Sequence, residues 1–239
     1  MTILALDTAT RAGSVALVST DTLLGSSSGD PERTHGERLP GDLLRLLSEC
    51  GTRLDEVDIF AVCSGPGAFT GLRVGLATVQ GFALATRRTV VAVPTLEALA
   101  HAGLERQPTG VHGRALVVPW MDAHRGEVFG AVYNVENDGV STERRPAAVG
   151  PAQALLLEWA PILRRSPVFF VGDAVDRARG AITDVLGRDL TMVQSMPPLA
   201  PTVARLAHAR GADAAEAPHA VRPVYIRRPD AEIARERHR

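Results

Sequence analysis

Residues 59–86 constrain the fold of this chain most, because they join an apolar run, a glycine-rich turn and a helix of small residues. The run IFAVC at 59–63 is short enough to be a buried strand. Residues 64–71 are rich in types that tolerate unusual backbone angles. Residues 72–85 then predict a helix, with Thr70 or Ser64 as its cap. The chain is therefore expected to be organised around a strand, a turn and a helix in that order.

The predicted helix is unusual for its small side chains. Glycine inside a helix costs roughly 0.5–1 kcal/mol relative to alanine, yet Gly75 and Gly81 lie inside this helix and Gly71 directly before it. Glycines at a spacing of four let another backbone approach closely. Two interpretations stay open: the helix is buried against the chain's own sheet, or it packs against a second protein.

The turn itself has the composition of a phosphate-binding loop. Free backbone N–H groups at the start of a helix attract anions, which makes Gly65 and Gly67 candidate nucleotide-binding residues. The turn does not match GxxxxGK[ST], however, and no lysine follows it. Nucleotide binding here remains an open prediction.

Composition excludes several classes of function. The chain has 239 residues, 45% of them hydrophobic and 22% charged, as expected for globular domains with real cores. Its formal net charge of −1 gives no overall basic footprint for nucleic acid. All 26 basic residues are arginine, which rules out Schiff-base lysines and lysine phosphate anchors.

The two cysteines and the length of the apolar segments bear on the cellular location expected for the protein. Cys50 and Cys63 form neither a CxxC motif nor a disulfide framework, so both are expected to be structural. No apolar run reaches the ~18 residues that span a bilayer, and the N-terminus has no charged signal-peptide region. No membrane association and a cytoplasmic location are therefore expected.

The start of the chain predicts antiparallel strands at 2–7 and 14–19, with a third at 22–25. This opening, with Asp7 in a threonine-rich turn, resembles that of the actin, sugar-kinase and Hsp70 superfamily. The resemblance implies that Asp7 lies near a nucleotide-bound metal. The turn lacks the lysine of many kinases, and the residues favour Asp7 as a turn-stabilising carboxylate over a magnesium ligand.

Residues 38–50 predict a helix whose stripe of leucines includes Leu39, Leu43 and Leu47. This stripe is either a core face or part of a partner surface. His35 precedes it and is interpreted as a loop or cap residue, with partner contact as the alternative. No HxxxH or HExxH motif occurs in the chain, so no metal site is expected.

The rest of the chain divides into a second domain and a returning end. A strand at 89–93 and a helix at 95–104 precede a linker at 107–113, which predicts domains at 1–106 and 107–199. Strands at 115–119, 167–172 and 190–194 and helices at 151–159 and 175–186 are expected in the second domain. The helix at 201–210 is expected to return to the first domain, and 228–239 to be disordered.

A polar cluster of Asp122, Arg125 and Glu127 joins two predicted strands of the second domain. Two carboxylates with separated pKa values suit a hydrolase, and Asp122 is also a candidate cofactor ligand. A salt-linked hairpin turn is the favoured interpretation. No catalytic residue is assigned.

The motif SGPGAFTGLRVG at 64–75 resembles the signature of the bacterial TsaB (YeaZ-like) family, which usually has serine at the position of Ala68. His35-Gly36-Glu37 before a leucine-rich helix and the segment 223–227 resemble the family as well. The resemblance runs from residue 1 to about residue 227. It implies an α/β, two-domain actin-like ATPase fold with a mixed sheet and flanking helices in each domain.

The resemblance also implies a function and partners. Members of the TsaB family are non-catalytic partner subunits of TsaD in forming threonylcarbamoyladenosine on tRNA, help to recruit the ATPase TsaE, and self-pair when TsaD is absent. The chain alone is expected to bind no cofactor, with ATP or ADP at the junction of the complex and tRNA bound through the complex. Helical spacing assigns these residues to the partner face: Leu39, Leu43, Leu47, Gly71, Val74, Gly75, Thr78, Gly81 and Phe82.

Two alternatives stay open at this point. An ATP-dependent small-molecule kinase of the same fold needs Asp7 and Asp122 to hold magnesium. A metalloprotease-like hydrolase needs a bound metal. For the partner-subunit hypothesis, Gly75→Leu or Gly81→Leu is expected to abolish dimer formation while the fold survives.

Overall fold

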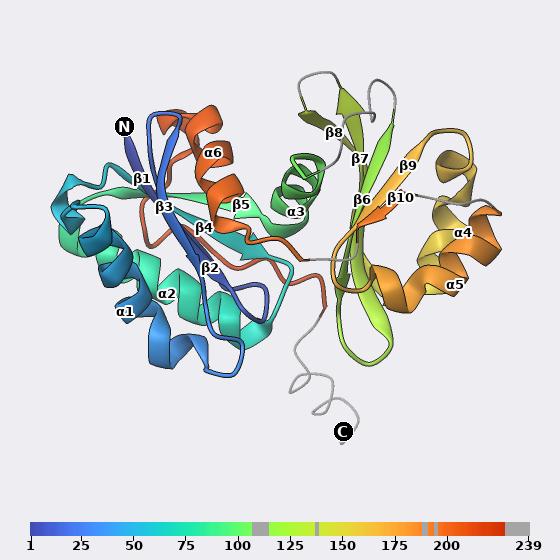
Figure 1. The fold of residues 1–239 in the computed structure, drawn as a ribbon, viewed down its shortest axis with the longest axis horizontal. Coiled ribbons are helices and arrows are strands. Elements are labelled where there is room, and N and C mark those ends of the chain that lie inside the picture. The colour runs from blue at the N-terminus through green and yellow to red at the C-terminus, as the bar shows by residue number, and fades with distance from the viewer. Residues whose placement is uncertain (107–114, 137–138, 188–190, 194–195, 228–239) are drawn as a thin grey trace.

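The computed structural model describes residues 1–106, 115–136, 139–187, 191–193 and 196–227. Two five-stranded sheets stand side by side, each with helices packed on it (Figure 1). The first sheet has the order β3-β2-β1-β4-β5 and the second has the order β10-β9-β6-β7-β8. Each sheet is mixed: β1 pairs antiparallel with β2 and parallel with β4, and β6 pairs antiparallel with β7 and parallel with β9.

The first sheet places its glycine-rich turn at the carboxyl end of its central strands. Its strands are β1 (Thr2–Asp7), β2 (Ser14–Ser19), β3 (Thr22–Ser28), β4 (Ile59–Gly65) and β5 (Thr89–Pro94). Every residue of β4 is buried, which is the pattern of a strand covered on both faces. Its neighbours β1 and β5 are both parallel to it, so the turn after β4 lies beside the end of β1.

Helices cover both faces of the first sheet. On the outer face, α1 (His35–Glu49) and α2 (Phe69–Thr86) lie side by side, and on the inner face lie α3 (Thr95–Leu104) and α6 (Ala200–Arg210) (Figure 1). One apolar cluster joins α1 and α2 to the sheet, with Leu43 and Phe60 fully buried in it. Although α6 is late in the sequence, it packs against β1 and β2.

The second sheet comprises β6 (Leu116–Asp122), β7 (Glu127–Glu136), β8 (Gly139–Pro151), β9 (Val168–Val171) and β10 (Thr191–Val193). Helices α4 (Ala152–Leu163) and α5 (Val175–Leu186) cover its outer face. The core between them is centred on Trp120, whose ring meets Trp159 and Phe170 edge-on at 5.7 Å each. Such edge-to-face pairs add to the stability that burial alone provides.

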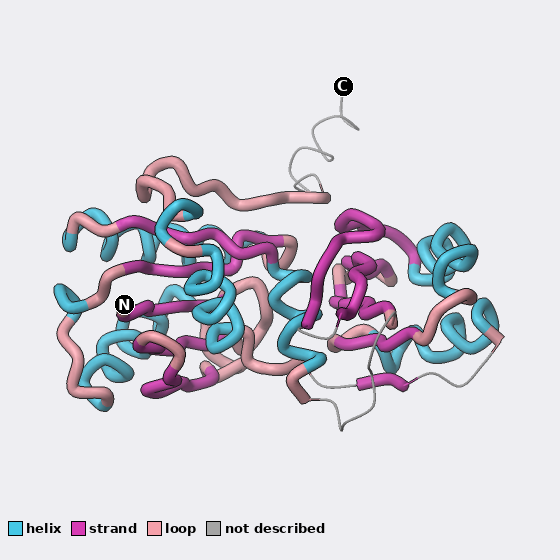
Figure 2. Tube along the Cα trace, turned by 90° about the horizontal axis from the view of Figure 1, so that it is seen from above, coloured by secondary structure: helices cyan, strands magenta, loops and turns pink. Residues whose placement is uncertain are grey.

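Helix α3 joins the two halves of the molecule. It lies between the sheets (Figures 1 and 2), and a single apolar cluster runs from β1 and α6 through α3 to β6 and β7. Gly103 of α3 allows close approach to the second sheet, because a Cβ there would lie 2.7 Å from the Val171 side chain. The domains are therefore in direct apolar contact on one side of the molecule.

Most predicted elements are confirmed, including the third strand and the helix at 175–186. The cap assignment for α2 is wrong: the helix starts at Phe69 with Ala68 as N-cap and no side-chain cap bond, and Ser64 belongs to β4. Helix α1 starts three residues earlier than predicted, so His35 is its first residue. Strand β8 was missed. The predicted linker at 107–113 and the predicted disordered tail at 228–239 lie outside the described residues.

Candidate functional site

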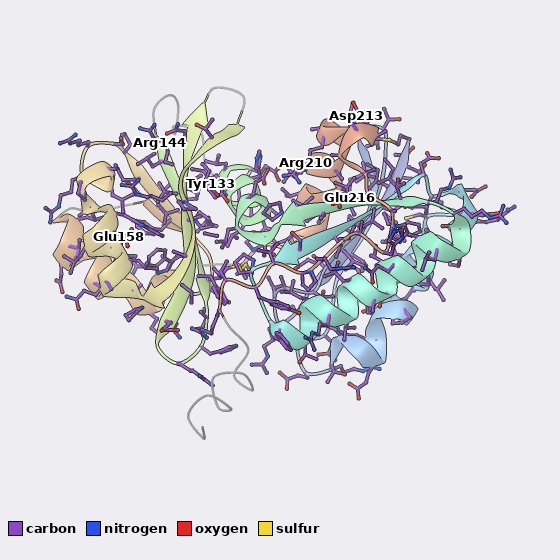
Figure 3. The ribbon with its side chains drawn as sticks, turned by 180° about the vertical axis from the view of Figure 1, so that it is seen from behind. Tyr133, Arg144, Glu158, Arg210, Asp213 and Glu216 are labelled. Atoms are coloured by element: carbon purple, nitrogen blue, oxygen red, sulfur yellow. The ribbon has the colours of Figure 1, made fainter. Side chains whose placement is uncertain are left out.

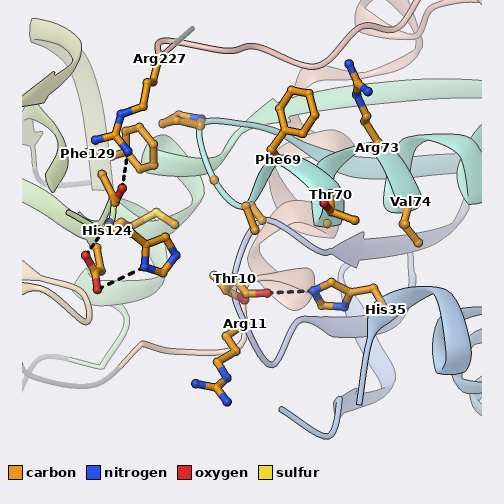
Figure 4. Close-up of a pocket in the computed structure, with 18 of the residues that line it drawn as sticks. Thr10, Arg11, His35, Phe69, Thr70, Arg73, Val74, His124, Phe129 and Arg227 are labelled. Carbon is orange, nitrogen blue, oxygen red and sulfur yellow. Dashed lines mark hydrogen bonds and ion pairs between the residues drawn. The ribbon is translucent and has the colours of Figure 1, made fainter. Parts of the chain in front are cut away.

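A cleft of about 1400 Å³ separates the two domains on the side away from α6. Six segments line it, as Figure 4 shows in part: the β1–β2 turn, the start of α1 with the loop before it, the start of α2 with the turn before it, the β6–β7 hairpin, Asp173 after β9, and the C-terminal segment. The predicted candidates Gly67 and Asp122 line this cleft, while Asp7 and Gly65 lie behind its wall. Two of the four candidate cofactor-binding residues therefore lie at the cleft, and cofactor binding by any of them stays a prediction.

Asp7, at the end of β1, is buried beneath the β1–β2 turn. Its side chain is 1% exposed and accepts hydrogen bonds from the Ala9 N–H at 2.8 Å and from the Thr10 hydroxyl. Burial raises the pKa of Asp7 above its ordinary value, and the Thr10 and Ala9 hydrogen bonds oppose that rise. The carboxylate acts as a turn-stabilising group, as the residues favoured.

The glycines of the turn before α2 are required by close packing within the chain. A Cβ on Gly67 would lie 2.6 Å from the Ala9 side chain, and one on Gly65 would lie 2.4 Å from the Val224 carbonyl oxygen. The Ala68 N–H donates to the Ala9 carbonyl oxygen, and the Gly65 N–H donates to the Thr95 hydroxyl oxygen at 3.1 Å. Internal contacts therefore use part of the turn that a phosphate loop would leave free.

Asp122 in the β6–β7 hairpin is also engaged within the chain. It accepts two hydrogen bonds from the Arg177 guanidinium at 2.7 and 3.0 Å, and one from the His124 N–H at 2.8 Å. The Arg177 hydrogen bond holds the pKa of Asp122 below its ordinary value. The neighbouring Asp173 accepts a hydrogen bond from the Asp122 N–H at 2.8 Å, and loss of solvent around its carboxyl group raises its pKa. Salt links hold this hairpin, as the favoured interpretation had it, but those of Asp122 and Glu127 run to Arg177 and Arg227, which lie outside the hairpin.

These observations do not fit the magnesium nucleotide that the superfamily implies. Asp7 is enclosed behind the turn and Asp122 is bound to Arg177, so neither carboxylate is presented to an ion in the cleft. Among the described residues, no group of three or more histidine, cysteine, aspartate or glutamate side chains is arranged to hold a metal. The residues of this chain alone therefore support no chemical step through a metal or a nucleotide.

His35 is neither a loop residue nor a cap, contrary to the sequence-based interpretation: it is the first residue of α1, whose N-cap is Thr34. One ring nitrogen lies 3.1 Å from the Thr10 carbonyl oxygen and the other lies 3.0 Å from the Arg38 guanidinium (Figure 4). Burial and the Arg38 charge lower the pKa of His35. Arg38 is itself 5% exposed and pairs with Asp42 at 2.7 Å. This buried pair was missed, because Arg38 and Asp42 resemble an ordinary exposed i,i+4 pair in the sequence.

The C-terminal segment contributes the cleft wall that sequence reasoning did not assign. Tyr225 stacks on Phe69 with ring centres 4.8 Å apart, and the Arg73 guanidinium lies 4.0 Å from the Phe69 ring centre. Arg227 reaches the opposite domain, where it lies over the Phe129 ring (Figure 4) and pairs with Glu127. The only sequence signal for this region was the resemblance of 223–227 to the family's closing segment.

The structure corrects part of the predicted partner face. Leu39, Leu43 and Leu47 are at most 3% exposed and belong to the core beneath α1. Gly71 and Gly75 face inward, because a Cβ on either would lie 2.1 Å from an atom of Thr8. These five residues cannot provide exposed contact atoms in the folded chain.

The remaining members of the predicted face are accessible. Gly81 faces open space, and Val74, Thr78 and Phe82 are partly buried along the same helix. Ala77 and Ala85 are exposed, and Leu84 is 60% exposed. The outer side of α2, the long helix in front in Figure 3, thus has no charged residue between Arg73 and the end of the helix at Thr86.

Two linked mixed sheets with a glycine-rich turn at the cleft define a protein of the actin-like ATPase fold class. The solved ROK hexokinase from Thermus thermophilus has this fold with a TM-score of 0.51 at 14% identity, covering 88% of this chain and 99% of that one. The sequence model of the family described as tRNA N6-adenosine threonylcarbamoyltransferase (TsaD) matches residues 30–235. Within that family, the chain belongs to the TsaB (YeaZ) group.

Two relatives support the assignment to the TsaB group. The tRNA threonylcarbamoyladenosine biosynthesis protein TsaB of Bacillus subtilis is 30% identical over 189 residues, which are 78% of this chain and 77% of the relative. The solved structure of YeaZ from Pseudomonas aeruginosa has a TM-score of 0.78 at 31% identity and covers 94% of this chain and 99% of that one. In the part of the chain that the structure describes, no helix combines the length and apolarity needed to cross a membrane.

Proposed function

We propose that this chain is a non-catalytic partner subunit of a TsaD-type transferase in the formation of threonylcarbamoyladenosine on tRNA. The proposal draws on the family of the chain and on the name of its Bacillus subtilis relative, a biosynthesis protein for that modification. It is supported further by the two acidic candidates, Asp7 behind the cleft wall and Asp122 in it, because hydrogen-bond donors of the chain itself engage both carboxylates. The protein acts in the cytoplasm.

The outer face of α2 carries this proposal. Ala77, Gly81 and Leu84 form an exposed strip on a helix whose other side is buried in the core. Small side chains let a second helix approach closely. The neighbouring helix α1 exposes Leu44 at 53% and Gly41. An apolar, uncharged strip of this kind suits a helix of the TsaD-type subunit, or the same strip of a second copy when that subunit is absent.

The remaining partners follow from the same role. The assembled pair recruits a TsaE-type ATPase, and tRNA binds through the complex. The first-turn N–H groups of α2 have no helical acceptors and lie beside the cleft at Phe69 and Thr70. ATP or ADP therefore binds at the junction of the subunits, where the partner supplies the groups that this chain lacks.

Reconstitution tests the proposal. A TsaD-type transferase, its activated threonylcarbamoyl substrate and tRNA are combined with and without this chain, and modified adenosine is measured. We expect modification to depend on both proteins and to be absent with this chain alone. Turnover by the chain alone would contradict a non-catalytic role. Calorimetry with Mg-ATP separates the kinase alternative, which requires micromolar binding and turnover by the isolated chain.

A further inference from the structure

The segment from Glu216 to Arg227 leaves the first domain after α6 and crosses to the second. Figure 2 shows it as a long loop that runs over the first domain and ends beside the second. It contains no helix or regular strand within its described length. Its contacts are nevertheless numerous and link parts of the chain more than 100 residues apart.

The first part of the segment is anchored on the sheet edge and on α2. Glu216 exchanges two backbone hydrogen bonds with Val90 of β5, at 2.8 and 3.0 Å. Figure 3 shows Glu216 beside that strand. The Gln80 side-chain amide of α2 donates to the carbonyl oxygens of Pro218 and Val221 at 2.8 and 3.1 Å. Since Val221 is 2% exposed, this part belongs to the first domain.

The middle of the segment is held at the turn before α2. The Val224 N–H donates to the Ser64 carbonyl oxygen at 2.7 Å. Tyr225 then stacks on Phe69, and its hydroxyl accepts a hydrogen bond from Arg73 at 3.1 Å. These contacts fix the direction in which the segment leaves the first domain, toward the mouth of the cleft.

The end of the segment contacts the second domain. The Arg227 guanidinium donates to the Ala123 carbonyl oxygen and pairs with the Glu127 carboxylate, and it lies 5.7 Å from the centre of the Phe129 ring. All three partners belong to the β6–β7 hairpin. The side chains of Arg227 and Glu127 are 21% and 34% exposed, so this charged pair is only partly screened by water.

We propose that this segment is an interdomain latch, with Arg227 as the residue that closes it. The domains share a continuous apolar core at α3, while the cleft opens between them on the side where Arg227 reaches the hairpin. Release of Arg227 lets the second domain rotate about α3 and widens the cleft. The segment therefore sets the opening of the cleft, independently of whether the chain serves as a partner subunit.

Hydrogen exchange of the full chain tests the latch. Arg227→Ala is compared with Arg222→Ala, which removes the same charge from the same segment but whose side chain donates only to the carbonyls of His219 and Val221 nearby. The backbone N–H groups of Ala123 and Glu127 are hydrogen-bonded within the β6–β7 hairpin, so their exchange rates report how often the hairpin is released. We expect their exchange to accelerate about tenfold in Arg227→Ala, as for a lost charge-assisted hydrogen bond, and to stay unchanged in Arg222→Ala.

Spin-label distances supply the second readout. Labels at Glu32 and His124, both exposed on opposite walls of the cleft, are introduced with Cys50→Ser. We expect a longer and broader distance distribution for Arg227→Ala than for Arg222→Ala. Unchanged exchange and unchanged distances would overturn the latch. If Arg227→Ala does not fold, Glu127→Gln removes the partner charge with little change of shape and is expected to shift both readouts in the same direction.

Discussion

The two sides of α2 use small residues for different reasons. On the inner side, Gly71 and Gly75 leave room for Thr8 of the β1–β2 turn, and a Cβ on either would lie 2.1 Å from that residue. On the outer side, Gly81 has nothing within 4 Å of the position of a Cβ. The inner glycines are explained by the chain's own packing, so only the outer side is left for a partner. The spacing of small residues along a helix indicates that another segment packs closely against it. It does not show whether that segment belongs to the same chain or to a partner.

The largest effect is expected at the inner side. In Gly71→Leu, the new side chain meets the Thr8 carbonyl oxygen, which the backbone cannot easily move. Overpacking of a core costs about 1–3 kcal/mol and occasionally more, and a clash with backbone belongs at or above the upper end. We expect thermal unfolding to show a large loss of stability or no folded protein. A normal melting temperature would contradict the inner packing.

Gly75 also lies on the inner side of α2, and this changes how the variant Gly75→Leu is interpreted. Its Cβ would meet the Thr8 hydroxyl oxygen at 2.1 Å and the Leu6 side chain at 3.1 Å. Loss of a dimer in this variant would reflect a damaged fold, so it does not test association. The sequence-based expectation that the fold survives Gly75→Leu is corrected by this contact.

Adjacent leucines of α1 extend the comparison between inner and outer sides. Leu43 is 0% exposed and Leu44 is 53% exposed. Leu43→Ala is expected to lower the free energy of unfolding by about 2–5 kcal/mol, and Leu44→Ala by less than about 0.5 kcal/mol. Urea denaturation measures both. Similar losses in the two variants would mean that α1 is rotated relative to the sheet.

The β1–β2 turn, which packs on the inner side of α2, is stabilised by Asp7. The titration of Asp7 is therefore a further test of this inner packing. Burial raises the pKa of Asp7 above 3.8 in the folded chain, so the folded state binds the proton more tightly than the unfolded state. This contribution to stability is present below pH 3.8 and is lost as pH rises through the folded-state pKa. The stability of the unaltered chain relative to Asp7→Asn should therefore fall over that range.

Denaturation at a series of pH values measures the difference between the two proteins. A difference that stays constant or grows as pH rises would show that Asp7 is not buried as a carboxyl group. Because both proteins share every other titrating group, the comparison cancels the general acid sensitivity of the fold.

The smallest effect is expected at Thr8. Its side-chain oxygen is buried and has no hydrogen-bond partner among the described residues. Removing an unpaired buried hydroxyl while keeping the branched shape is neutral or stabilising, so Thr8→Val should change the free energy of unfolding by less than about 1 kcal/mol, toward greater stability. A loss larger than that, measured by urea denaturation, would indicate a hydrogen bond at Thr8.

Local patterns predicted the elements, and contacts distant in sequence determined the rest. Leucine spacing identified α1, and the apolar run identified β4, because burial of one face or of both leaves a periodic signal. Strand β8 was missed because its sequence GVSTERRPAAVGP contains two prolines and does not alternate between apolar and polar residues, and its place is set by pairing with β7. The start of α2 was misplaced because Ala68 carries no capping side chain.

Two of the candidates chosen from sequence motifs, Asp122 and Gly67, line the cleft, but the contacts made around them could not be predicted. Arg177, which binds Asp122, is 55 residues away, and Arg227 is 100 residues from its partner Glu127. Nothing in the local sequence distinguishes these two arginines from the others in the chain. Only the fold shows which charges meet.

The outer side of α2 is tested most directly by two matched glycine variants. Gly81 and Gly180 both lie inside exposed helical surfaces with open space at the Cβ position, on α2 and α5 respectively. Sedimentation of each leucine variant, alone and mixed with a TsaD-type subunit, measures association. We expect Gly81→Leu to stay folded and lose the complex, and Gly180→Leu to keep it. Retention of the complex by Gly81→Leu would contradict a partner surface on α2.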